Sequence, residues 1–436
     1  MKDRSERPRP TRRRLKDQPR PQRSAEEWPP REDRAERQPA ERRRPGDGAV
    51  FCGISENCGG CPWMKVPAID QRRRKVVLVR EALEEQPELA EVPVEHCLES
   101  AWPRTYRNRA KLAVRGGGRV RLGLYVRGSD ELVATERCPV HRPAISSALR
   151  PLAEWLGKHR LAAPRGPIRY VDVREATGSR GAVHVTLVSV KPIEPERLPN
   201  ADLRRRMPGR LVGLAMNINP DNSSYVFGDT TVRVWGSKRF AATLPGSWPG
   251  ADLRLEVPAT GFFQVNACQI PPVASLIGGH LAEAGEGAWF DLYCGVGTWG
   301  IAASRVLGEP PRRLLGVEDN AASVACAADN ARAAGLGRVA RYRAGKTEEA
   351  VAGMVAEESP VAVILNPGRP GCRPEALDEL IKAAPRRMAY LSCNPETLAR
   401  DLALLAGGGF TVTRVIPIDM MPHTDQVEAL ALLELS

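Results

Sequence analysis

The sequence predicts an α/β fold, in which a C-terminal domain with an open parallel sheet follows a mixed α+β region. From about residue 258 onward, apolar strands alternate with helical patterns. A glycine-rich turn follows one of those strands. Shorter strand-like runs between turns occupy much of the chain before residue 258. The chain has 436 residues, enough for two or three domains with buried cores.

The composition is that of a globular protein with a polyanionic partner. Hydrophobic residues make up 42% and charged residues 27%, and no apolar run approaches the ~20 residues of a membrane span. The net charge is +12. Lys and Arg gain affinity for nucleic acids by displacing counterions from phosphates. We therefore expect a soluble protein that contacts no membrane.

Residues 1–48 form a basic segment rich in proline. They hold 16 Lys and Arg against 10 Asp and Glu, a net of +6. Without apolar periodicity the segment cannot bury enough surface to offset chain entropy, so we predict a disordered basic arm. It serves either as an RNA tether or as a solubilising tail. It also lacks the apolar core of a secretory signal, so we expect a cytoplasmic protein.

Residues 49–95 are predicted to form a cluster-binding loop and a helix. The helical pattern covers residues 68–86 and is basic in its first part. Three thiolates packed closely call for a cation, and a fourth would complete a tetrahedral or cubane site. Cys138 is the first candidate for that ligand, and Cys97 competes with it. Spacing alone leaves zinc and an iron–sulfur cluster open. The array itself has the spacing C-x5-C-x2-C: Cys52, Cys58 and Cys61.

Residues 96–257 are predicted to form the mixed α+β domain. Runs such as "IRYVDVRE" and "AVHVTLVSV" alternate in the manner of β-strands. The stretch from Tyr106 to Lys111 combines an aromatic side chain with basic ones. Such a group can hold a backbone phosphate and stack a base, or it can be a solvated strand edge.

Residues 258–436 are predicted to bind a ligand at their strand ends. Glycines let the backbone approach a ligand closely where open α/β sheets bind it, and an acid after the next strand suits ribose hydroxyls. The turn glycines are Gly295, Gly297 and Gly300. Polar residues end four successive strands: Asp291, Glu318, Asn366 and Cys393. This arrangement indicates a site for a nucleoside with a second, flat substrate beside it.

Cys393 is either a small core residue or a nucleophile. If the second substrate is a pyrimidine, a thiolate that adds at C6 raises the electron density at C5, which can then accept a methyl group. A base must afterwards remove the C5 proton. Glu428 enters the apolar run "VEALALLEL", where an acid costs several kcal/mol unless it is paired or protonated. It is therefore the candidate base, although an exposed strand-end Glu remains the alternative.

The motifs together resemble those of the S-adenosylmethionine-dependent RNA uracil-C5 methyltransferases. The resemblance covers residues from about 50 to the end and implies a Rossmann-like class I methyltransferase domain. It makes Cys393 the nucleophile and Glu428 the base. It rests on these segments, in this order: "GFFQVNACQ", "DLYCGVGTWGIA", "GVEDNAASVACAADNA", "LNPGRPG", "YLSCNPETLARDL" and "DMMPHTDQVEALALL".

The resemblance also implies two cofactors and an RNA partner. The predicted contacts of S-adenosylmethionine are Gln264, Tyr293, Gly295, Glu318 and Asn366. The predicted ligands of a [4Fe-4S] cluster are Cys52, Cys58, Cys61 and Cys138. The cluster is expected to act in structure or RNA placement, because the family does not use it for methyl transfer. We expect a monomer.

Within the family, the sequence is most like the branch without a TRAM barrel that methylates 23S ribosomal RNA. No such barrel fits into residues 1–48, and Asn366-Pro367 is typical of that branch. The transfer-RNA branch is the nearest alternative. Three residues depart from the family pattern: Gly368, Met421 and Gln426. Two other hypotheses are methylation of an exocyclic amino group, which leaves Cys393 without a role, and a catalytically inactive RNA-binding relative.

Overall fold

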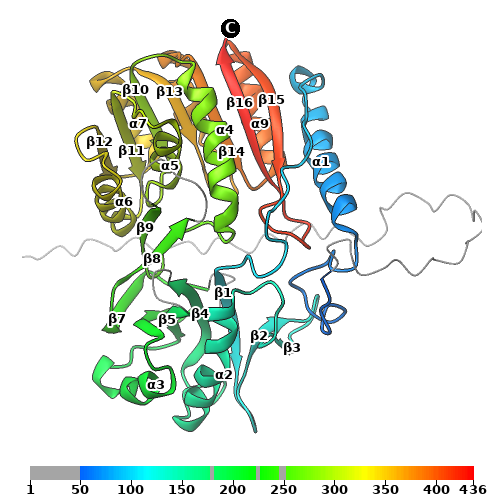
Figure 1. The fold of residues 1–436 in the computed structure, drawn as a ribbon, viewed down its shortest axis with the longest axis vertical. Helices are drawn as coiled ribbons and strands as arrows, with labels where there is room; N and C mark the ends of the chain where they lie inside the picture. Colours follow the sequence, from blue (N-terminus) through cyan, green and yellow to red (C-terminus); the bar gives the residue numbers. More distant parts are fainter. Residues whose placement is uncertain (1–49, 177–180, 222–225, 245–251) are drawn as a thin grey trace, which may run out of the picture. The chain divides into compact units, whose positions relative to one another are not determined.

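The computed structural model describes residues 50–176, 181–221, 226–244 and 252–436 (Figure 1). The arm predicted over residues 1–48 lies outside these ranges. Within the described ranges, no helix combines the length and the apolar character that crossing a membrane requires.

A seven-stranded sheet forms the region that follows the cysteine array. Its strand order is β3-β2-β1-β4-β5-β6-β7, and neighbouring strands are antiparallel except for β5 and β6. Trp155 of the helix α2 is buried in the core of this region. The strands are β1 (Arg109–Arg115), β2 (Arg121–Tyr125), β3 (Leu132–Ala134), β4 (Ile168–Ala176), β5 (Ala182–Ser189), β6 (Leu211–Ile218) and β7 (Thr230–Gly236). The helical segments are α2 (Pro143–Lys158), η2 (Pro195–Arg197) and α3 (Asn200–Arg206).

A second seven-stranded sheet lies in the C-terminal part of the chain (Figure 1). Its order is β12-β11-β10-β13-β14-β16-β15, with β10 to β14 parallel and β16 antiparallel to both of its neighbours. The strands are β10 (Ala288–Leu292), β11 (Arg313–Glu318), β12 (Ala340–Ala344), β13 (Pro360–Leu365), β14 (Arg387–Ser392), β15 (Phe410–Ile418) and β16 (Glu428–Leu435). The helices are α4 (Ile270–Ala282), α5 (Thr298–Leu307), α6 (Ala321–Ala333), α7 (Thr347–Glu357), α8 (Pro374–Ala383) and α9 (Pro395–Gly407).

A short two-stranded sheet links these regions. It consists of β8 (Arg239–Leu244) and β9 (Leu253–Pro258), which pair in antiparallel register. The turn η3 (Ala267–Gln269) follows and leads into α4. The segment between β9 and η3 carries the motif "GFFQVN".

Local sequence explains the two helix starts that border the C-terminal strand ends. α5 begins after Gly297, whose φ of 78° lies in the left-handed region that glycine adopts without a steric cost. α9 begins with Pro395 in its first turn, and the side chain of Asn394 accepts a hydrogen bond from the amide of Glu396. Each helix therefore starts after a short turn that follows a strand, and it turns the chain back at the edge of the sheet.

The first helix, α1 (Ala68–Glu84), packs on the C-terminal sheet. Its apolar side chains, such as Val79 and Leu83, share a core with Leu398 and Leu402 of α9. Beyond the turn η1 (Pro87–Leu89), Val94 and Leu98 form β-bridges to β15. Figure 1 shows α1, in blue, beside α9 and the red strands β15 and β16. The segment that follows the cysteine array therefore covers a sheet that begins some 200 residues later.

Candidate active site

A cavity of about 780 Å³ opens at the carboxyl ends of the parallel strands. Its size is in the range of pockets that hold a nucleoside-sized ligand. Every residue that the sequence predicted as a catalytic residue or a methyl-donor contact lines it: Gln264, Tyr293, Gly295, Glu318, Asn366, Cys393 and Glu428. These residues come from six separate segments of the chain, so they lie together only in the folded protein.

Cys393 lies in the turn between β14 and α9. The turn is fixed by Ser392, whose hydroxyl donates to the carbonyl of Asn394 and accepts from its amide, both at 3.1 Å. Burial raises the pKa of the Cys393 thiol, and the charge of Glu428 raises it further. The guanidinium of Arg369 acts in the opposite direction. The thiol is thus half-buried in a pocket that also contains a cation able to stabilise its thiolate.

Glu428 is the first residue of β16. Ala429, its neighbour, pairs with Ser392, the last residue of β14, so Glu428 and Cys393 lie at adjacent strand ends. The side chain of Glu428 is buried, and burial raises its pKa to about 7. A carboxyl with this pKa can accept a proton near neutral pH and release it again. The alternative, in which Glu428 is an exposed residue at a strand end, does not match this burial.

The glycine-rich turn lies at the opposite side of the cavity. Asp291 is fully buried at the end of β10 and accepts the amide of Gly300 at 3.0 Å. Burial raises the pKa of Asp291 to about 7. Glu318 accepts the amides of Gly295 at 3.1 Å and Asn320 at 3.0 Å, and burial raises its pKa to about 7. A carboxylate that already accepts two amides at the mouth of a Gly-rich turn can also accept ribose hydroxyls.

The loop 366–371, which follows β13, forms another wall of the cavity. The carbonyl of Arg369 accepts hydrogen bonds from Asn394 and Thr397 of the α9 start, at 3.3 and 3.1 Å. The guanidinium of Arg369 donates to the side chain of Gln426. A Cβ built on Gly368 would meet only Pro370, at 3.7 Å, so a side chain would fit there. Gly368 and Gln426 depart from the family pattern, yet the loop keeps its hydrogen bonds to the start of α9 and to Gln426.

The stretch from Tyr106 to Lys111 makes contacts inside the protein. Tyr106 is buried and donates to the carbonyl of Pro422 at 3.2 Å. Asn108 donates to the carbonyl of Gln264 at 2.9 Å, and Arg109 forms an ion pair with Asp172. The sequence left two alternatives open for this stretch, RNA contacts or a solvated strand edge, and the contacts of these three side chains lie within the protein. The contact of Asn108 braces the loop that carries Gln264.

The cysteines of the predicted cluster site lie in one region of the structure. Cys52, Cys61 and Cys138 pack against the same small apolar group, which includes Met64. Burial, together with the charges of Cys138, Cys58 and Cys52, raises the pKa of Cys61 to about 12, as expected for neighbouring thiols. In the described part of the chain, however, no three His, Cys, Asp or Glu side chains converge closely enough to hold a metal ion. Four thiols are donors that suit a thiolate-bound metal, although the described side chains do not converge on one point.

Cys97 is separate from that group. Burial raises its pKa to about 12, and the charged groups that affect it most are Asp419 and Lys75. Of the two candidates for the fourth thiol, Cys138 is therefore the one that neighbours the array.

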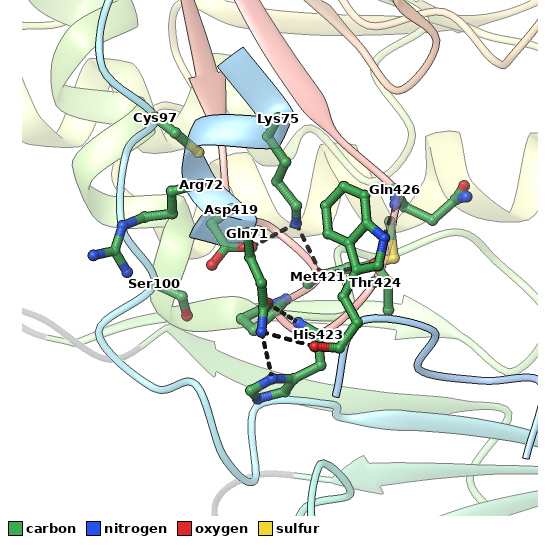
Figure 2. Close-up of polar contacts among 12 residues, drawn as sticks. Gln71, Arg72, Lys75, Cys97, Ser100, Asp419, Met421, His423, Thr424 and Gln426 are labelled. Carbon is green, nitrogen blue, oxygen red and sulfur yellow. Dashed lines mark hydrogen bonds and ion pairs between the residues drawn. The ribbon is translucent and has the colours of Figure 1, made fainter. Parts of the chain in front are cut away.

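The sequence interpretation missed a buried polar group beside the cavity. Gln71 and Lys75 of α1 contact Asp419 and His423 in the loop between β15 and β16 (Figure 2). Gln71 and Lys75 are four residues apart, on the same helix face as the buried Val79. That spacing on an apolar face was the signal that could have identified them.

Comparison with known proteins identifies the family. The family model described as tRNA (Uracil-5-)-methyltransferase matches residues 262–436. An uncharacterized RNA methyltransferase of Gloeobacter violaceus is 32% identical over 403 residues, which cover 88% of this chain and 82% of that protein. This protein belongs to the tRNA (uracil-5-)-methyltransferase family of RNA methyltransferases. Another uncharacterized RNA methyltransferase, from Halalkalibacterium halodurans, is 28% identical over 393 residues, which cover 88% and 82% of the two chains.

A solved structure shares the fold of this family member. The tRNA (uracil-54, C5)-methyltransferase of Pyrococcus abyssi, in complex with S-adenosyl-L-homocysteine, superimposes with a TM-score of 0.62. The sequences are 23% identical, and the match covers 83% of each chain. The α/β methyltransferase fold expected from the sequence is thereby confirmed.

Proposed function

We propose that this protein transfers a methyl group from S-adenosylmethionine to C5 of a uracil in RNA through a covalent adduct with Cys393. The observation that carries the proposal is the placement of Cys393 and Glu428 at adjacent strand ends, in a cavity that the glycine-rich turn also lines. A thiol and a base beside a nucleoside-type site are what attack on a pyrimidine ring requires.

The protein side chains take two roles in this reaction. Cys393 loses its proton to solvent water, and its thiolate adds to C6, which moves the electron pair of the C5–C6 double bond toward C5 and O4. After methylation, C5 carries both a methyl group and a proton. Glu428 removes that proton, the double bond re-forms, and the bond from the sulfur of Cys393 to C6 breaks. The raised pKa of Glu428 suits this step, because the carboxyl must then release the proton again.

The cavity fits the methyl donor. We propose that Glu318 holds the ribose hydroxyls of S-adenosylmethionine, and that Gln264 and Asn366 contact the rest of the molecule beside Tyr293. Gly295 has a φ of 55°, and no atom lies within 4 Å of a Cβ built there, so the turn leaves open space for the ligand. S-adenosylmethionine supplies an electrophilic methyl group when it is bound.

We also propose that Cys52, Cys58, Cys61 and Cys138 hold a [4Fe-4S] cluster. The support is a set of four neighbouring thiols from two distant segments. Such a site would join residues 52–61 to the turn at 138. Anaerobic purification should yield a brown protein with about four iron and four sulfide per chain. A colourless protein with stoichiometric zinc would contradict this assignment.

The RNA target that we propose is 23S ribosomal RNA. The proposal rests on Asn366-Pro367, which is typical of the ribosomal branch. The tRNA substrate named for the Pyrococcus abyssi structure makes transfer RNA the second candidate. Mapping of 5-methyluridine in both RNAs, with and without the gene, decides between them. Loss of the modification from transfer RNA alone would exclude the ribosomal target.

Covalent trapping tests the reaction itself. RNA from cells grown on 5-fluorouracil lacks the C5 proton at substituted positions, so the adduct cannot be released. We expect wild-type protein with S-adenosylmethionine to form a protein–RNA complex that survives denaturing electrophoresis, and Cys393→Ala to form none. Glu428→Gln should accumulate the same complex on ordinary uracil RNA. Normal turnover by Cys393→Ala would exclude the mechanism.

A further inference from the structure

Two residues of α1 contact the loop that leads into Glu428. Lys75 is 0% exposed, and its ammonium group donates to the carboxylate of Asp419 at 2.6 Å and to the carbonyl of Met421 at 3.0 Å. A buried ammonium group is tolerated when it is paired and hydrogen-bonded in this way. Figure 2 shows Lys75 reaching from the helix to both groups.

Gln71 is one helical turn before Lys75 and makes a second set of contacts with the same loop. Its side-chain carbonyl accepts the amide of His423 at 2.7 Å, and its amide nitrogen lies 3.3 Å from Nδ1 of the His423 ring (Figure 2). The same amide donates to the carbonyls of Trp63 and Val66, at 3.1 and 2.8 Å. Trp63 in turn donates its amide to the carbonyl of His423 at 3.0 Å. Gln71 thus ties the loop to α1 and to the segment that follows the cysteine array.

The loop depends on these contacts for its shape. Residues 419–427 join β15 to β16 without regular secondary structure. His423 has a φ of 69°, an uncommon value for a residue with a side chain, which persists only where the surroundings determine it. Nε2 of its ring also lies 2.8 Å from the carbonyl of Pro103. The position of Glu428 is therefore set by its strand on one side and by this held loop on the other.

We propose that Gln71 and Lys75 are positioning residues that orient Glu428 for removal of the C5 proton. This inference rests on the proposed function and adds two residues of the N-terminal helix to it. Cys393 is positioned by β14 and α9, whereas Glu428 follows the loop that α1 holds. A loosened loop should therefore slow release of the adduct and leave its formation largely intact.

The test compares adduct formation with adduct release. The variants are Lys75→Met, which keeps the length of the side chain, and Gln71→Leu, with Lys75→Arg as the conservative replacement. Arg73→Gln is the matched control, because Arg73 is on the same helix and its side chain is 73% exposed. Bulk ribosomal and transfer RNA from cells that lack the gene serves as the substrate.

We expect Lys75→Met and Gln71→Leu to lower kcat for methylation by about tenfold to a hundredfold, because a misplacement of about 1 Å can cost that much. Because adduct formation is unaffected, kcat/KM for the RNA should stay within about twofold, so that KM falls together with kcat. Denaturing gels should show a methylated protein–RNA adduct that accumulates during turnover, as with Glu428→Gln. Lys75→Arg should restore part of the release rate, and Arg73→Gln should behave as wild type.

Two results would overturn the inference. One is normal release by folded Lys75→Met and Gln71→Leu. The other is parallel loss of adduct formation and release, which a general structural role predicts. Thermal unfolding identifies a variant that does not fold, and the other variant then carries the test. Wild-type protein is assayed first on 5-fluorouracil RNA. Absence of a wild-type adduct refutes the proposed function, whereas a wild-type adduct with normally active variants refutes only the positioning role.

Discussion

At the scale of single residues, burial raises the pKa values of both proposed catalytic groups, but into different pH ranges. The pKa of Glu428 is raised to about 7 by burial, and the pKa of Cys393 is raised above its ordinary value by burial and by Glu428. The positive charge of Arg369 lowers the pKa of Cys393 and so opposes its rise. Glu428 must be ionised to remove a proton, and Cys393 must be ionised to attack. The two steps should therefore depend on pH in different ranges.

Rapid-mixing experiments at a series of pH values can resolve these ranges. Below pH 7, the ionised fraction of Glu428 falls about tenfold per pH unit, so the rate of adduct release should rise with pH and level off above about 7. The rate of adduct formation should continue to rise above pH 7, because the Cys393 thiol ionises there. A release rate that is independent of pH between 5 and 7 would contradict the role of Glu428.

At the scale of elements, α9 joins the nucleophile to the loop 366–371. Asp401 of α9 is fully buried and accepts the amide of Cys372 at 2.7 Å and the hydroxyl of Tyr390 at 2.5 Å. Arg400 forms an ion pair with it and donates to the carbonyl of Pro370 at 2.9 Å. One carboxylate of α9 thus holds both β14 and the segment after β13.

Replacement of this carboxylate should destabilise the protein. Asp401→Asn replaces a carboxylate oxygen with an NH2 group that faces the donors of Cys372 and Tyr390, so at least one buried donor loses its acceptor. Hydrogen bonds to charged groups contribute about 1.5–3 kcal/mol, and we expect a loss of about 2–4 kcal/mol in the free energy of unfolding. Urea titration measures this loss. Asp378→Asn on α8, at a position for which the structure shows no buried bond, is the control, and equal effects of the two substitutions would contradict the explanation.

Much of the C-terminal domain and its cavity could be predicted because the signals are local. The apolar strand, the turn at Gly295 and the acid at Glu318 lie close together in sequence. Cys393 also follows a recognisable strand pattern, and Glu428 begins one. The spacing of Lys75 on the face of Val79 could have indicated its burial, whereas its partner Asp419, 344 residues away, could not be predicted. The acceptors of Tyr106 and Asn108 could not be predicted for the same reason, since they lie at residues 422 and 264.

At the scale of the whole molecule, charge should govern the affinity for RNA. The first 48 residues supply +6 of the net charge of +12. Each phosphate that Lys or Arg neutralises releases counterions, so binding weakens as salt increases. The part of the chain that holds the proposed catalytic residues begins well beyond this segment.

Removal of residues 1–48 should therefore weaken RNA binding and reduce its dependence on salt. The slope of log affinity against log salt should become shallower, whereas kcat at saturating RNA should stay within about twofold of the full-length value. Fluorescence anisotropy at several salt concentrations measures the slope. An unchanged slope would show that the segment makes no contact with RNA and is a solubilising tail.

The antiparallel strand β16 has a consequence for the order in which the protein can assemble during synthesis. It inserts between β14 and β15, although it leaves the ribosome after both of them. Until residues 419–435 emerge, the nascent chain has an ammonium group on α1 without its carboxylate partner and a reactive thiol without its base. Contacts over such long sequence separations form late in folding. Removal of the C5 proton, and with it release of the adduct, should therefore become possible only after β16 has emerged and paired with β14.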